Sequence, residues 1–370
     1  MQFIEPIADL KKMFARIFWK KYGMAMAIAV GSLFLAGISL KVISANSVNR
    51  AKTPSKSSHL DLVKKRGYLI CGISGKLPGF SFVDATGTYV GLDVDLCRAV
   101  AAALFDDPTK VEFVKFDTGT RFSALRSQKI DLLSRNTTNS LSRDTKMGLE
   151  FTPTIFYDAQ GFMVARNSNI NSLADLAGKS ICIAGGTPSL STLNERFKQL
   201  KLEYKPVLYD DNEALFGAYE HGRCAAITRD ISQLAIYRKL LANPKQHQIL
   251  AETLSKEPLA PAVKDGDSSW ADVVKWVTYA TIQAEELDID SENINIYRNT
   301  KDGETRRFLG IEGELGSQMG LSDDFAVRVI KHVGNYREIY ERNLGKPFGL
   351  KRGQNALWFD GGLMYSPPFR

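Results

Sequence analysis

Short apolar runs alternate with stretches of helical periodicity from residue 67 onward. The first run, Tyr68–Ile73, lies between Gly67 and Gly75 and predicts a strand. In Asp93–Phe105 the apolar residues recur at helical spacing, which predicts a helix with one buried face. The alternation continues as strand, helix and strand over Val111–Phe116, Arg121–Gln128 and Ile130–Ser134. Repeats of this kind predict a parallel sheet with helices on both faces.

A second alternating run begins near Gly161. A capping pattern at Ser172 predicts a short helix that ends at Gly178. Further strands and helices are expected at Ser180–Ala184, Ser189–Leu200, Tyr204–Tyr209, Asn212–Glu220, Cys224–Thr228 and Ile231–Leu240. Two α/β units joined by two crossings predict a hinged, bilobal α/β fold. The last third is expected to be mostly helical, with amphipathic helices at Trp270–Leu287 and Phe325–Tyr340 whose apolar stripes serve packing.

The N-terminus has the pattern of an export signal. Gly23–Leu40 contains 18 residues without a charge and follows five Lys/Arg residues, and Ala45 is an acceptable cleavage position. An uncleaved membrane anchor is the alternative, since 18 apolar residues just span a bilayer. Residues 46–58 are polar and predict a flexible linker. Residues 1–45 also carry six Lys/Arg and two Asp/Glu, so much of the net charge of +7 lies there, and no nucleic-acid partner is expected.

Four cysteines accompany this export signal. An even number in an oxidising compartment indicates disulfides. The expected topology pairs Cys71 on the first strand with Cys97 on the next helix, and Cys182 with Cys224 on neighbouring strands. Buried free thiols are the alternative. The chain has no C-x-x-C spacing, and its histidines (His59, His221, His247 and His332) are scattered, so neither a zinc site nor any other cofactor is expected.

The stretch 67–164 carries the most specific signal. It contains GYLICGISGKLPGFSFVDATGTYVGLDVDLCRAVAAALF, SRNTTNSLSRDTKMGLEFT and YDAQGFMV, and its arginine after the third strand suits a small carboxylate ligand. The stretch resembles the extracellular solute-binding proteins of family 3, the polar amino acid receptors of ABC importers. Within this family it resembles the general L-amino acid binding proteins. The tail NALWFDGGLMYSPPFR extends the resemblance to Arg370.

The resemblance implies a periplasmic-binding-protein type II-like fold with a helical C-terminal region. Residues 59–157 and 256–370 are expected in lobe 1 and residues 158–255 in lobe 2, with a return crossing at Ser255–Pro258. The implied function is a non-catalytic, monomeric periplasmic receptor that passes an L-amino acid to a membrane permease. The alternative is an exported enzyme on the same scaffold, such as a dehydratase or transglycosylase. Its candidate carboxylates, Glu150 and Asp158, lie in no recognisable catalytic motif.

The resemblance also assigns roles to the groups that recognise an α-amino acid. Arg143 is expected to bind the carboxylate, with Thr138 and Asn136 before it. Asp230 in the other lobe is expected to bind the ammonium, although Asp230 is also a suitable N-cap for the helix that follows. Arg229 beside it either repels the ammonium or pairs with a carboxylate on the ligand's side chain.

Backbone donors at a helix start should complete the site. Gly186 and Thr187 are expected there, but Pro188 has no N–H, and Leu190 replaces a common acidic residue, so the ligand's identity stays open. Phe80 is expected either to cover the ligand's aliphatic part or to pack under the lobe. Ser74 stands where cation-specific relatives have a carboxylate, which favours a broad pocket.

Overall fold

The computed structural model describes residues 58–370. The predicted export signal, residues 1–45, and residues 46–57 of the predicted linker lie outside the described residues. Residue 58, the last of that predicted linker, is the serine whose hydroxyl caps helix α3. Among the described residues, no helix has the length and apolar content needed to cross a membrane.

The first sheet contains the strands predicted between residues 68 and 134. Its order is β5-β1-β6-β15-β7. The strands are β1 Leu69–Ile73, β5 Val111–Lys115, β6 Leu132–Leu133, β7 Leu149–Phe151 and β15 Ala262–Lys264. β1 pairs in parallel with β5 and β6, as the alternation predicts, whereas β15 returns from later in the chain and runs antiparallel to β6 and β7.

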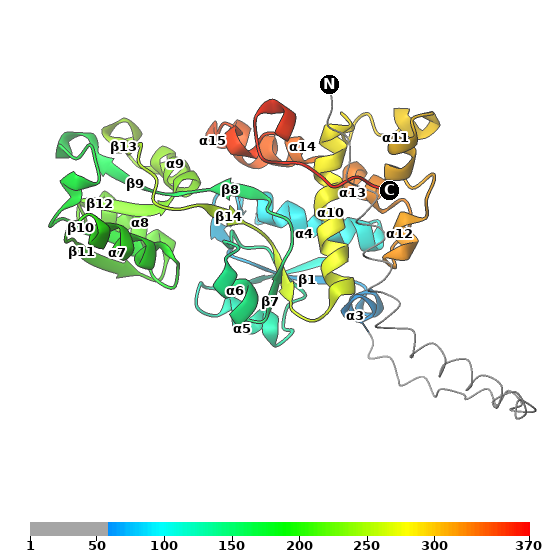
Figure 1. The fold of residues 1–370 in the computed structure, drawn as a ribbon, viewed down its shortest axis with the longest axis horizontal. Coiled ribbons are helices and arrows are strands. Elements are labelled where there is room, and N and C mark those ends of the chain that lie inside the picture. Colours follow the sequence, from blue (N-terminus) through cyan, green and yellow to red (C-terminus); the bar gives the residue numbers. More distant parts are fainter. Residues whose placement is uncertain (1–57) are drawn as a thin grey trace, which may run out of the picture. The chain divides into compact units, whose positions relative to one another are not determined.

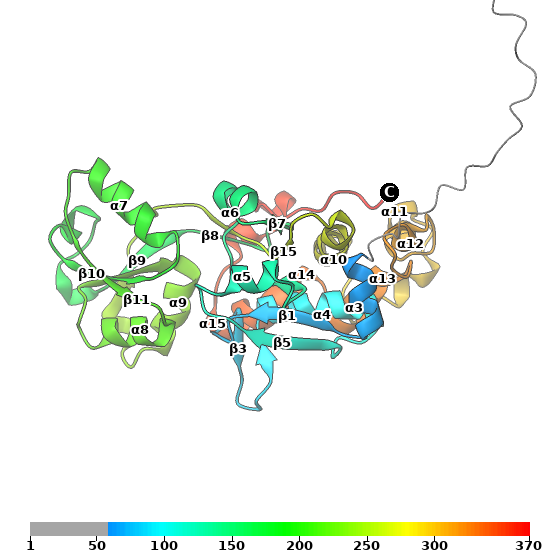
Figure 2. The same cartoon turned by 90° about the horizontal axis from the view of Figure 1, so that it is seen from below.

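The second sheet contains the strands of the second alternating run. Its order is β11-β10-β12-β9-β13, and β10 is parallel to β11 and β12. The strands are β9 Gln160–Ala165, β10 Ser180–Ala184, β11 Lys205–Tyr209, β12 Ala226–Asp230 and β13 His247–Ile249. Two sheets, each with its own helices (Figures 1 and 2), confirm the predicted bilobal type II fold.

The helices divide between the two sheets. The first sheet is accompanied by α3 His59–Arg66, α4 Leu92–Phe105, α5 Arg121–Arg126, α6 Leu141–Lys146, α10 Ser268–Glu286, α11 Gly303–Phe308, α12 Leu315–Gln318, α13 Phe325–Val333, α14 Tyr336–Tyr340 and α15 Lys346–Phe348. The second is accompanied by α7 Ser189–Gln199, α8 Asn212–Glu220 and α9 Ile231–Leu240. α4, α10 and α13 pack together and form much of the first core.

Several elements differ from the sequence prediction. The helix expected over Phe325–Tyr340 is two helices, because Gly334 has a φ of +95° and Asn335 starts α14 with a reciprocal capping box. The short helix expected after Ser172 is a single 3-10 turn, Ala174–Leu176. A small antiparallel sheet of β2 Lys76–Leu77, β3 Ser81–Val83 and β4 Tyr89–Val90 was not predicted.

Two chain segments cross between the sheets. β8 Phe156–Asp158 and β14 Glu257–Leu259 pair in an antiparallel ladder, which Figure 1 shows between the two lobes. The predicted lobe limits at 157/158 and 255/256 fall within or beside these strands, and the ranges themselves stay a prediction.

The C-terminal segment braces the first crossing. Tyr157 lies opposite Pro258 in the β8–β14 ladder, and its own backbone N–H and carbonyl point away from β14. The amide of Asn355 meets them on that outer side, accepting the backbone N–H at 2.6 Å and donating to the carbonyl at 3.1 Å. The Tyr336 hydroxyl also donates to the Ile155 carbonyl at 2.7 Å.

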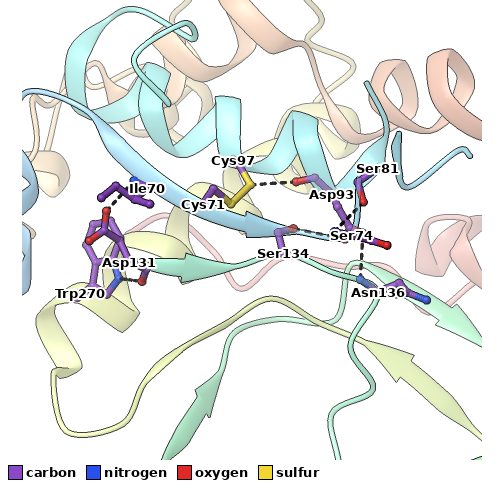
Figure 3. Close-up of a disulfide and its surroundings, with 10 residues drawn as sticks. All are labelled: Ile70, Cys71, Ser74, Ser81, Asp93, Cys97, Asp131, Ser134, Asn136 and Trp270. Carbon is purple, nitrogen blue, oxygen red and sulfur yellow. Dashed lines mark hydrogen bonds between the residues drawn. A yellow bond between two sulfur atoms is a disulfide. The ribbon is translucent and has the colours of Figure 1, made fainter. Parts of the chain in front are cut away.

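Both predicted disulfides are present. Cys71 and Cys97, with Cα atoms 6.3 Å apart, join β1 to α4 (Figure 3), and Cys182 and Cys224, with Cα atoms 5.6 Å apart, join β10 to the residues before β12. The first disulfide ties α4 to the central region of the first sheet, and the second ties β10 to the segment that leads into β12.

Candidate functional site

A polar cavity lies where the lobes meet, and both lobes line it. The lining residues are Thr118, Arg121, Arg135, Asn136, Thr138, Arg143 and the crossing residue Glu257 on one side, and Thr187, Pro188, Ser189, Arg229 and Asp230 on the other. The lobes also touch beside it, since the ammonium of Lys76 lies 2.8 Å from the carboxylate of Asp211. Small-ligand sites commonly lie at such junctions.

Arg143 lies in α6, and its side chain is buried. Its Nη1 donates to the Thr138 carbonyl at 2.8 Å, and its guanidinium lies 5.4 Å from the centre of the Phe122 ring. Burial lowers the pKa of Arg143, while the carboxylates of Glu257 and Asp230 oppose that shift. The guanidinium is therefore anchored by one nitrogen and keeps further donors for an anion in the cavity.

Asn136 holds an unusual backbone conformation at the site. Its φ is +30°, which non-glycine residues rarely adopt. Its backbone N–H donates at 2.9 Å to Asp93 in the first turn of α4 (Figure 3), and the Ser134 hydroxyl donates to the same carboxylate at 3.3 Å. Burial raises the pKa of Asp93 to about 7. Asp93 thus fixes the loop that carries both Asn136 and Thr138.

Asp230 ends β12 and faces this loop from the second lobe. The side-chain amide of Asn136 donates to its carboxylate at 3.4 Å. Asp230 stands at the N-cap position of α9, yet its side chain makes no capping hydrogen bond, which leaves the carboxylate directed to the cavity. Asp158 in β8 is close enough that Asp230, after burial, helps raise the pKa of Asp158 to about 7. The Thr138 hydroxyl donates at 2.6 Å to Glu257 in β14.

The start of α7 supplies the second-lobe wall. Thr187, Pro188 and Ser189 line the cavity, so Pro188 removes a backbone donor at the predicted place. Gly186 does not line it. Gly186 has a φ of +64°, and a Cβ there would lie 3.2 Å from Cγ2 of Thr118 in the other lobe. Gly186 therefore permits close approach of the lobes, and its expected ligand contact stays a prediction.

Phe80 and Ser74 do not line the cavity. Phe80 is fully buried in the first core, edge-to-face with Phe156 at 5.2 Å, so it packs under the lobe and does not cover a ligand there. The Ser74 backbone N–H donates to the Ser81 hydroxyl at 3.2 Å, which fixes the turn after β1. Neither residue lines this cavity, and the ligand-binding roles expected for them stay predictions.

Three arginines in the cavity were missing from the predicted site. Arg121 and Arg135 were not singled out, and Arg229 was expected either to repel the ammonium or to pair with a carboxylate on the ligand's side chain. Arg121 follows β5 and Arg135 follows β6, both at the carboxyl ends of parallel strands. Because ligands of α/β sheets bind at that edge, strand position was the signal that could have found them.

The family model for bacterial extracellular solute-binding proteins, family 3, matches residues 69–293. The chain belongs to this family. It is 45% identical over 320 residues to the general L-amino acid-binding periplasmic protein of Rhizobium johnstonii, which covers 85% of this chain and 94% of that protein. It is 43% identical to the glutamate/glutamine/aspartate/asparagine-binding protein of Rhodobacter capsulatus, covering 92% of this chain and 99% of that protein.

A solved structure is similar over the same range. The periplasmic binding protein from Brucella ovis with glutathione bound is 44% identical, with a TM-score of 0.82 over 85% of this chain and all of that one. This family 3 protein is therefore a solute-binding protein with a small-molecule ligand and a membrane permease as partner. The alternative of an exported enzyme is set aside, because the relatives of this chain are carriers without enzymatic activity.

Proposed function

We propose that this family 3 protein is a monomeric periplasmic receptor that binds free L-amino acids between its lobes and delivers them to an ABC permease. One observation carries the proposal: Arg143 and Asp230 line a single cavity from opposite lobes. An α-amino acid presents one carboxylate and one ammonium, and this pair of side chains complements both charges. The names of the amino acid-binding relatives support the same ligand class.

Each lining group has a role in this proposal. Arg143 takes the α-carboxylate through its free donors, and Ser189, whose backbone N–H donates to the Thr187 hydroxyl at 3.4 Å, lines the cavity at the start of α7. Asp230 takes the α-ammonium, and Thr138 orients Glu257 beside it. A ligand bridging the two lobes stabilises the conformation in which they touch, which is the hinge closure expected of such a receptor.

Glutathione is a second candidate ligand, because a relative at 44% identity was solved with it bound. Its γ-glutamyl end keeps a free α-carboxylate and a free α-ammonium. Arg143 and Asp230 would therefore bind the head group of glutathione in the same way as that of an amino acid.

The proposal is tested on the exported protein in two steps. Mass spectrometry of the material released on denaturation should identify co-purified amino acids or glutathione. Calorimetry on the refolded, ligand-free protein should then give one site per chain for members of a panel of L-amino acids and glutathione. Absence of binding by the whole panel would overturn the proposed function.

Replacing Pro188 tests whether the proline at the start of α7, which has no N–H, weakens ligand binding. Pro188 has φ −65° and ψ −16°, which other residues adopt without strain. Pro188→Thr adds one backbone N–H facing the cavity, and a hydrogen bond to a charged acceptor contributes about 1.5–3 kcal/mol. Calorimetry should show tighter binding of every amino acid by about tenfold or more. Unchanged affinity would mean that this N–H does not reach the α-carboxylate.

A further inference from the structure

The candidate cavity carries more positive charge than its own acids balance. Four arginine guanidinium groups line it, against the carboxyl groups of Asp230 and Glu257. Burial raises the pKa of Glu257, and its carboxylate already accepts hydrogen bonds from the Ser255 and Thr138 hydroxyls. Buried charges require partners. A ligand that enters this cavity must therefore carry more negative charge than the single α-carboxylate that its own ammonium balances.

Arg121 is one of two arginines lining this cavity whose Nε has no hydrogen-bond partner among the described residues. Arg121 is only 3% exposed. Its side chain donates a hydrogen bond to the Thr118 carbonyl, and its guanidinium lies over the Phe122 ring, 4.4 Å from the ring centre. Burial and the nearby guanidinium groups, Arg135 first, lower the pKa of Arg121 to about 8. An anion beside Arg121 would relieve both effects.

Arg229 is the second cavity arginine whose Nε lacks a hydrogen-bond partner among residues 58–370, and it lies in the opposite lobe. It is 6% exposed. Its Nη1 lies 3.8 Å from the carboxylate of the adjacent Asp230, beyond hydrogen-bond distance. Asp230 is also the group proposed to bind the α-ammonium, so it does not fully compensate Arg229.

Arg135 and Arg143 are accounted for differently. Arg135 donates to the Phe116 carbonyl at 2.9 Å and to the Thr118 hydroxyl at 3.4 Å, and Asp93 lies near it. Arg143 is assigned to the α-carboxylate. The groups left for a further anion are therefore Arg121 from the first lobe and Arg229 from the second.

We propose that Arg121 and Arg229 form a second anion subsite, which takes a carboxylate at the far end of the ligand's side chain. This inference rests on the proposed function and narrows its ligand class to amino acids with an acidic side chain. Two guanidinium groups from opposite lobes on one carboxylate would add charge-assisted hydrogen bonds that a neutral side chain cannot form to the same strength. A basic side chain would meet like charge and be rejected.

The test compares L-glutamate with L-glutamine, which have the same shape and differ in side-chain charge. Calorimetry on the ligand-free protein should show glutamate binding about tenfold to a hundredfold more tightly, the range for a charged hydrogen bond. Arg121→Gln and Arg229→Gln should each bring this ratio close to one, while glutamine affinity changes much less. Arg126→Gln is the matched control, because Arg126 is exposed on the same helix as Arg121.

The outcomes separate the two proposals. Binding of neutral amino acids without preference for glutamate overturns the second subsite and leaves the receptor function standing. Equal losses for glutamate and glutamine in both variants also overturn it, since they indicate a structural role. If no amino acid binds to the parent protein, the receptor function fails and the subsite fails with it.

Discussion

Arg143→Ala should greatly raise the dissociation constant of every ligand that carries an α-carboxylate. The variant leaves the carboxylate in a buried site without the guanidinium that neutralises it. Truncating one partner of a buried charge pair costs about 2–5 kcal/mol, which raises the dissociation constant by about 30-fold to several thousandfold. Calorimetry with the tightest-binding ligand of the parent protein measures the effect directly.

The matched control is again an arginine of the first lobe. Arg126→Ala removes the same side chain from an exposed position and should leave the affinity unchanged. Arg143→Lys should recover part of the loss, because an ammonium keeps the charge but cannot form the two parallel hydrogen bonds of a guanidinium. If Arg143→Ala binds as the parent does while keeping its thermal transition, Arg143 has no part in recognition.

Removing the second-lobe disulfide should destabilise the protein by about 4 kcal/mol. Cys182 and Cys224 are 42 residues apart, and the chain-entropy relation for a loop of this length gives that value. The double variant Cys182→Ala/Cys224→Ala should therefore unfold at a lower denaturant concentration than the parent under oxidising conditions. A thiol reductant should shift the parent further than the variant, which keeps only Cys71–Cys97. Coincident unfolding curves for variant and oxidised parent would contradict the prediction.

The parallel strands and their helices were the most predictable part of the fold. The limits of β10, α8 and α9 agree with the apolar pattern, because each packs one face on a continuous core. The antiparallel strands β9 and β13 and the β2–β4 sheet were missed. Their partners lie elsewhere in the chain or in short, partly exposed turns, so local periodicity contains little information about them.

The site was only partly predictable from the sequence. What could be predicted came mainly from the resemblance to the solute-binding family and less from the residue pattern itself. Arg143 and Asp230 are drawn together by the meeting of two lobes, which no local pattern specifies. Arg121 looked like an ordinary residue at a helix start, yet it is buried and its guanidinium lies over the Phe122 ring. For Phe80 the sequence left two alternatives open, and the structure places this aromatic residue in the first core.

The Asn355 amide occupies the outer edge of β8 much as a third strand would. A protein shortened before Asn355 would lose both hydrogen bonds to Tyr157, and its hinge backbone would exchange them for water. Because β8 is a segment that crosses between the lobes, we expect such a change to alter the populations of open and closed lobes. An apparent dissociation constant scales inversely with the fraction of molecules in the binding-competent form. Affinities measured on a tail-trimmed protein would therefore describe a different equilibrium, even with every cavity residue intact.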